Sequence, residues 1–71
     1  MKLDTKGLNC PLPILRAKKA LKKIDSGQTL TIEATDPGSA QDFESFCNQT
    51  GNILVSSNEE DNIYNFVIQK V

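Results

Sequence analysis

The chain has 71 residues, 38% of them hydrophobic, and a formal net charge of −1. This length is enough for one small domain, excludes a second, and limits the core to a few kcal/mol of net stability. The near-neutral charge argues against general affinity for nucleic acid.

The chain contains two cysteines and no histidine. A disulfide framework and a Cys–His catalytic pair are therefore excluded, and the commonest metal ligand is missing. We expect neither a metal site nor a cofactor. The sequence has no apolar stretch that reads as a signal peptide or a membrane span, which predicts a cytoplasmic protein.

The first half of the chain predicts a strand, a helix and a second strand. Leu3 to Gly7 can form a short strand, and Asn9-Cys10-Pro11 begins the helix. The helix stops at Asp25-Ser26-Gly27, where the glycine suits a left-handed cap. Thr29 to Thr35 alternates apolar and polar residues, as a strand with one buried face does. The predicted buried face of the helix consists of Ile14, Ala17, Ala20, Leu21 and Ile24.

The second half predicts a helix and a hairpin. Ser39, with Asp42 three residues later, approximates a capping box for a helix that runs to about Thr50 and is closed by Gly51. Two further strands follow, joined into an antiparallel hairpin by the turn sequence Asn58-Glu59-Glu60-Asp61-Asn62. These strands are Ile53 to Ser57 and Ile63 to Val71.

The element order is therefore βαβαββ. Two helices for four strands favour a two-layer α/β (α+β) sandwich, a four-stranded mixed sheet with both helices on one face. A right-handed crossover makes the first two strands parallel. Without repeats or linkers, residues 1–71 read as a single domain.

Cys10 is the candidate reactive residue. It lies in Gly7-Leu8-Asn9-Cys10-Pro11-Leu12-Pro13, just before the first helix, and we expect it at the N-cap position. Unpaired N–H groups and the helix dipole stabilise a thiolate there. Because Pro11 and Pro13 have no N–H, the first-turn donors left near the sulfur are those of Leu12 and Ile14.

The residue spacing favours a single nucleophile or sulfur acceptor over a dithiol couple. A thioredoxin-like motif needs a second cysteine where Pro13 stands. The alternative for Cys10 is an inert, small apolar residue. Cys47 shares a helical face with Phe43 and is expected in the core, although a disulfide with Cys10 stays open if the two sulfurs lie close together.

A basic cluster on the first helix is a candidate docking surface. These residues are either an ordinary solvated helix face or a surface that attracts an acidic partner protein. Leu12 and Leu15 fall outside the buried arc and could form an apolar rim beside Cys10. Asp36 is expected to be a turn residue. The basic residues are Arg16, Lys18, Lys19, Lys22 and Lys23, and an acidic run is formed by Glu59, Glu60 and Asp61.

Together these residues resemble the small sulfur carriers of the TusA or SirA-like family. The resemblance rests on Leu3-Asp4, the run from Gly7 to Pro13, Lys18-Lys19, Asp36-Pro37, Phe46-Cys47, Tyr64, Phe66, Ile68 and Lys70. It implies a βαβαββ sandwich in which Cys10 accepts sulfane sulfur as a persulfide from a cysteine desulfurase and passes it to an acceptor protein. The first turn, Pro11 to Ile14, would stabilise the persulfide.

The resemblance also implies a destination for the sulfur, such as 2-thiouridine in tRNA or cofactor biosynthesis. We expect a monomer with sulfurtransferase character that docks its partners through Leu12, Leu15, Arg16, Lys18, Lys19 and Lys22. One alternative is a regulatory or adaptor module in which Cys10 is redox-sensing or incidental. Direct RNA binding is not expected, because the charge is near neutral and there is one tyrosine.

Overall fold

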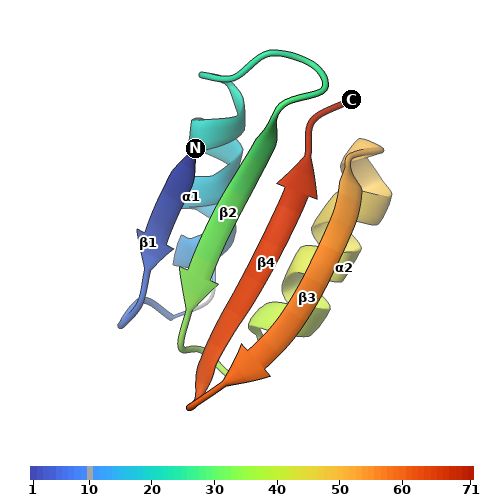
Figure 1. Cartoon of the computed structure of the whole chain (residues 1–71). Coiled ribbons are helices and arrows are strands. Elements are labelled where there is room, and N and C mark those ends of the chain that lie inside the picture. The colour runs from blue at the N-terminus through green and yellow to red at the C-terminus, as the bar shows by residue number, and fades with distance from the viewer. Residues whose placement is uncertain (10) are drawn as a thin grey trace.

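A computed structural model describes residues 1–9 and 11–71 of the chain. Its elements follow the predicted order, and both helices cover one face of a four-stranded sheet (Figure 1). The strand order is β1-β2-β4-β3, with β1 parallel to β2 and the other two pairs antiparallel. The predicted two-layer sandwich is confirmed. The elements are β1 (Lys2–Thr5), α1 (Leu12–Leu21), β2 (Thr29–Ala34), α2 (Ser39–Thr50), β3 (Ile53–Glu60) and β4 (Ile63–Gln69).

The core lies between the sheet and the two helices. Every second residue of β2 and β4 points toward the helices, which is the period expected of strands with one buried face. The Phe43 ring of α2 packs on the Phe66 ring of β4, with centroids 4.8 Å apart. The described residues that form the hydrophobic core are Ala17, Ala20, Leu21, Leu30, Ile32, Ala34, Phe43, Phe46, Cys47, Phe66 and Ile68.

Helix α1 ends at Leu21, earlier than the predicted Asp25. Gly27 is therefore not its cap, although it has a left-handed backbone with φ of +90°. The segment after the helix bonds to the end of the sheet instead of continuing the helix. The Lys70 Nζ donates to the Ile24 carbonyl at 2.8 Å, and the Gly27 N–H donates to the Lys70 carbonyl at 2.6 Å.

Helix α2 begins without the predicted capping box. Gly38 is the N-cap and no side-chain hydrogen bond caps the helix, because Ser39 is already its first residue and is buried. Asp42 instead contributes an acidic side chain to the first turn. The predicted end is confirmed: Gly51 takes the left-handed conformation and its N–H donates to the Cys47 carbonyl.

The β3–β4 hairpin has a shorter turn than predicted. Strand β3 continues to Glu60 and β4 starts at Ile63, so the turn consists of Asp61 and Asn62 alone. Both residues have positive φ, 53° and 64°, as a two-residue type I′ turn requires. Among the described residues, no helix is long and apolar enough to cross a lipid bilayer.

Candidate functional site

The loop between β1 and α1 is tied to the end of β2. Strand β1 ends at Thr5, before the predicted Gly7, and the Thr5 hydroxyl donates to the Glu33 carbonyl at 2.6 Å. The Gly7 N–H donates to the Thr35 Oγ1 at 2.9 Å, and the Leu8 N–H donates to the Thr5 carbonyl at 3.2 Å. The residues that lead up to the candidate cysteine are thus held by the sheet.

Cys10 itself lies outside the described residues, but its neighbours correct the predicted helix start. Pro11 is the N-cap of α1, with φ of −97° and ψ of 16°, so the helix begins one residue later than expected. The Leu12 N–H donates to the Asn9 carbonyl at 2.8 Å, and the Leu15 N–H donates to the Pro11 carbonyl at 3.1 Å. The Leu12 N–H is therefore occupied, contrary to its predicted role as a donor to the sulfur.

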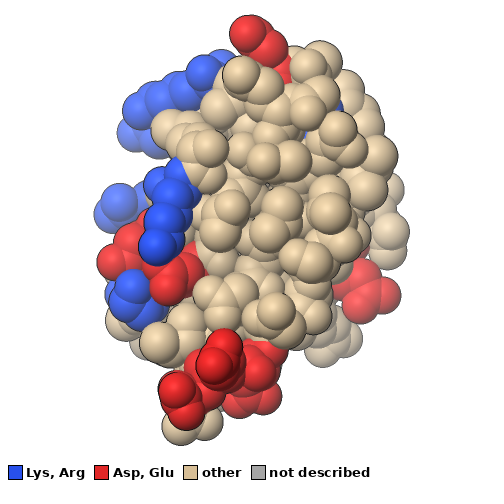
Figure 2. Space-filling view, viewed as in Figure 1, with Lys and Arg blue, Asp and Glu red and all other residues tan. Residues whose placement is uncertain are grey.

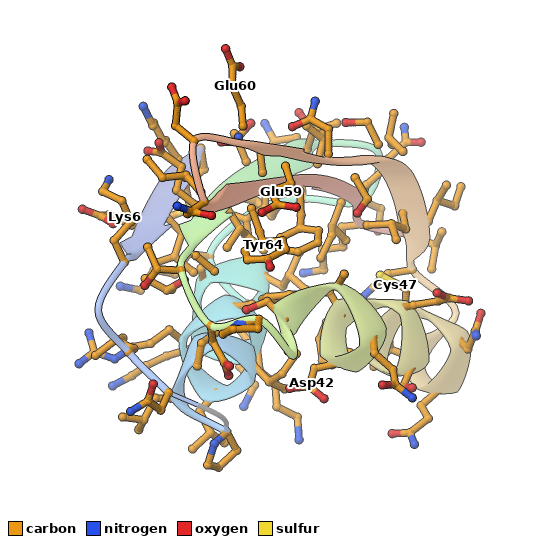
Figure 3. The ribbon with its side chains drawn as sticks, turned by 90° about the horizontal axis from the view of Figure 1, so that it is seen from below. Lys6, Asp42, Cys47, Glu59, Glu60 and Tyr64 are labelled. Atoms are coloured by element: carbon orange, nitrogen blue, oxygen red, sulfur yellow. The ribbon has the colours of Figure 1, made fainter. Side chains whose placement is uncertain are left out.

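The loop between β2 and α2 meets the same end of the sheet. The Gly38 N–H donates to Asp36 Oδ1 at 3.1 Å and the Ser39 N–H donates to the Asp36 carbonyl at 3.0 Å, which confirms Asp36 as a turn residue. Both helices begin at this end, which Figure 3 views directly. The positive ends of two helix dipoles therefore lie on the side of the molecule where the β1–α1 loop is anchored.

The first turns of α1 combine buried and exposed apolar residues. Pro13 is buried and Ile14 is half-buried against the core. Leu12 is 43% exposed and Leu15 is 52% exposed, as the helical pattern predicts. In its first turns, α1 therefore presents two large apolar side chains to solvent.

Charge is unevenly distributed over the surface. Lys and Arg side chains gather along the edge where β1 and α1 lie, whereas Asp and Glu gather at the β3–β4 hairpin (Figure 2). The cations of β1 and of its loop have acidic partners: Lys2 lies 3.2 Å from Glu33, and Lys6 lies 3.2 Å from Asp4. The hydrogen bonds to Lys6 hold the pKa of the Asp4 carboxyl below its ordinary value. Arg16, Lys18, Lys19 and Lys22 are all exposed.

Cys47 belongs to the core, as predicted. It is 4% exposed on the side of α2 that faces the sheet (Figure 3), and burial raises the pKa of its thiol. A raised pKa keeps the sulfur protonated and unreactive.

No sequence pattern pointed to the residues that anchor the loop. Thr5 and Thr35 bond to partners 28 positions away, and their roles depend on the parallel pairing of β1 with β2. Tyr64 is half-buried between the sheet and the start of α2, also at this end (Figure 3).

The fold and the loop define a class of small proteins. They are two-layer sandwiches in which a Cys-Pro-x-Pro sequence runs into the first turn of the first helix, at the end of the sheet where both helices begin. The chain belongs to the TusA family: residues 1–70 match the family described as Sulfurtransferase TusA.

Relatives support this assignment in sequence and in structure. The chain is 59% identical to the sulfur carrier protein TusA of Allochromatium vinosum, over 96% of this chain and 90% of that one. The crystal structure of a SirA-like protein from Desulfitobacterium hafniense superimposes with a TM-score of 0.85 at 28% identity, covering 97% of this chain and 96% of that one. Family membership supports a sulfur carrier role, which involves sulfur donor and acceptor proteins.

Proposed function

We propose that Cys10 carries sulfane sulfur as a persulfide, loaded by a cysteine desulfurase and passed to a thiol of an acceptor protein. The observation that carries this proposal is the family match over residues 1–70, which includes Cys10 in its Cys-Pro-x-Pro sequence. We place the protein in the cytoplasm as a monomer. The sulfur then serves 2-thiouridine formation in tRNA or cofactor biosynthesis.

The loading step is a thiol–persulfide exchange. The Cys10 thiolate attacks the terminal sulfur of the persulfide on the donor, so a new S–S bond forms on Cys10 while the S–S bond of the donor breaks. The donor cysteine leaves as a thiolate and takes up the proton. The acceptor thiolate repeats this attack on the Cys10 persulfide, so the two transfers need no external oxidant or reductant.

The start of α1 supports an anionic sulfur through its dipole. The partial positive charge of a helix N-terminus favours a thiolate or a persulfide anion within the first turn. Directed donation from Leu12 is not part of the proposal, because its N–H is bonded to Asn9. The stabilisation is assigned instead to the helix end formed by Pro11, Leu12, Pro13 and Ile14.

Two features of the chain protect a persulfide on Cys10 from attack by a second thiol of the same chain. Pro13 stands where a resolving cysteine would discharge the persulfide. The thiol of Cys47 is buried and has a raised pKa, so it is a poor nucleophile. Release then depends on the thiol of an acceptor protein.

Docking of donor and acceptor is assigned to the exposed side of α1. Leu12 and Leu15 supply exposed apolar contact area in the first turns of α1, and exposed cationic side chains lie on the same helix and just after it. Such a surface would steer an acidic partner and make binding sensitive to salt. The cations assigned to docking are Arg16, Lys18, Lys19 and Lys22.

The test is mass spectrometry of the protein after incubation with a cysteine desulfurase, pyridoxal phosphate and cysteine. We expect the intact protein to gain one sulfur atom, the peptide map to place it on Cys10, and a reductant to remove it. Cys10→Ser should abolish loading, whereas the matched variant Cys47→Ser should retain it.

Loading that survives in Cys10→Ser would overturn the assignment. A wild-type protein that is not loaded by several desulfurases, but whose Cys10 reacts readily with an alkylating probe, would favour the adaptor or redox-sensing role. In that role, partner proteins should bind equally well to wild type and to Cys10→Ser.

A further inference from the structure

A groove separates β1 from the side of α1 that faces it. Its volume is about 480 Å³, and it is lined by Met1, Leu3, Arg16, Lys19, Ala20 and Lys23. Leu3 is half-buried and Ala20 is buried, so the floor is apolar. The three long cationic side chains form one wall of the groove.

The cations of this groove differ from those of β1 and its loop, which form ion pairs with acidic residues. Lys2 and Lys6 are paired with Glu33 at 3.2 and 3.6 Å, so their charge is largely neutralised. Within residues 1–9 and 11–71, the ion pairs involve β1 and its loop and none involves a cation of the groove. The positive charge beside the groove is therefore available to an anion from outside the chain.

The groove also borders a free sheet edge. Strand β1 is the outermost strand on this side, with β2 as its one neighbour in the described sheet. The outer N–H and C=O groups of an edge strand can pair with an added strand. Alternate residues of such a strand lie about 6.8 Å apart and point to the same face of the sheet.

We infer that this groove binds an extended, acidic segment of a partner protein, which adds a strand to the free edge of β1. Alternate acidic side chains of the segment then face Arg16, Lys19 and Lys23. The inference rests on the proposed function in one respect, because it assigns the segment to the sulfur donor or acceptor.

A protein segment fits this surface better than RNA. Sequence-tolerant binding of single strands uses exposed aromatic side chains as stacking platforms. The aromatic residues of this chain are three phenylalanines, all buried, and one half-buried tyrosine on the helix side of the sheet. The groove offers cations and a strand edge, which together match a carboxylate-rich peptide.

The test follows the amide NMR spectrum of the isotope-labelled protein while a short synthetic peptide of alternating glutamate and threonine is added. We expect shifts concentrated in Lys2–Thr5 and around Arg16, Lys19 and Lys23. A peptide with glutamine in place of glutamate should bind about tenfold more weakly. Added salt should weaken the binding of the acidic peptide.

Two variants of equal net charge separate the groove from general attraction. Lys19→Glu should weaken peptide binding about tenfold. The double variant Gln41→Glu/Gln49→Glu changes the net charge equally, but both positions lie on α2 and outside the groove lining, so binding should be retained. All three replaced side chains are exposed, so both variants should fold.

Equal weakening by the two variants, no peptide binding, or binding without shifts in β1 would overturn the inference. Stronger perturbation of the same amides by oligouridine would overturn it in favour of nucleic acid. Because the titration involves no sulfur, it is independent of persulfide loading. A protein that loads Cys10 but fails the titration loses the inference alone, whereas failure to load Cys10 counts against the carrier function.

Discussion

The Thr35 hydroxyl accepts a hydrogen bond from the Gly7 N–H at 2.9 Å, although the two residues are 28 positions apart. This bond joins the loop after β1 to the end of β2. The position of the loop that leads to the candidate cysteine therefore depends on the residue that directly follows the neighbouring strand.

Replacing Thr35 with valine tests this anchor. Thr35→Val keeps the shape of the side chain but removes the acceptor, and it should lower the free energy of unfolding by about 1 kcal/mol. Persulfide loading of Cys10 should also become slower. Urea unfolding and timed mass spectrometry measure the two effects. Thr31→Val, the same change in the middle of β2, should stay within about 0.5 kcal/mol of wild type; equal effects of both variants would contradict an anchoring role.

Glycine is required at position 7 because of the left-handed backbone conformation there, and not because a side chain would clash with its neighbours. Its φ is +82°, and a Cβ at this position would meet no atom within 4 Å. Gly7→Ala should therefore cost about 1 kcal/mol or more from the left-handed conformation alone. Gly38→Ala is the matched control, because φ there is −81° and the added Cβ makes ordinary contacts at 3.8 Å. Denaturant unfolding should show the control to be neutral or stabilised by about 0.5 kcal/mol.

The hairpin turn also requires a left-handed backbone conformation, at Asn62. Its φ of 64° is tolerated by asparagine and glycine but strained for a β-branched residue. Asn62→Val should lower the free energy of unfolding by about 1–2 kcal/mol, whereas Asn62→Gly should retain stability. Asn58→Val, within β3, should be neutral or favourable because valine suits a strand. Thermal unfolding of the three variants distinguishes the turn from a flexible loop, which would tolerate valine at position 62.

Burial of Cys47 predicts both its reactivity and a pH dependence. An alkylating probe should modify Cys47 only after unfolding. Since burial raises the folded-state pKa above 9.0, the folded protein retains a proton that the unfolded chain releases at high pH. The stabilising contribution of this thiol is complete below pH 9.0 and is lost as the pH rises through the folded-state pKa.

Cys47→Ala should remove that part of the pH dependence, which is measured as the difference between two unfolding series above and below pH 9.0. It should also cost about 1 kcal/mol at neutral pH, because it leaves a small cavity. Identical slopes for wild type and variant would show that Cys47 does not contribute.

The two-layer arrangement was predictable because apolar periodicity reports which faces are buried. Ala17, Ala20 and Leu21 recur at helical spacing, and Leu30 and Ile32 alternate along β2, so each face could be assigned locally. The pattern could not locate the end of α1. Ile24 continues the helical spacing, but its carbonyl bonds to Lys70 at the far end of the chain, a contact that local sequence does not encode.

In the hairpin, the sequence pattern predicted a turn that is too long. Asn58 to Glu60 has the composition of a turn, yet these residues pair with β4 from Asn65 to Ile63. Pairing with a neighbouring strand outweighs weak intrinsic propensity at the sheet edge. The turn is then left with the two residues that accept positive φ.

For the candidate site, the sequence predicted a cysteine just before a helix, but it did not predict the residues that hold the preceding loop. The cap assignment was wrong by one residue because Leu12 closes a turn onto Asn9 before the helix begins. The roles of Thr5 and Thr35 follow from strand pairing and could not be read from spacing. The sequence therefore located the start of the helix to within one residue, but not the hydrogen bonds that hold the loop before it.

The positions of the two chain ends bear on how the protein can be handled. Both lie at the end of the sheet away from the β1–α1 loop (Figure 1). Met1 lines the groove beside β1, so an affinity tag at that end would obstruct the proposed binding of acidic segments without covering the loop. A surface tether at Val71, which lies near Gly51, avoids both regions. Immobilisation through Val71 therefore suits capture experiments, in which an N-terminal tag could mask a genuine partner.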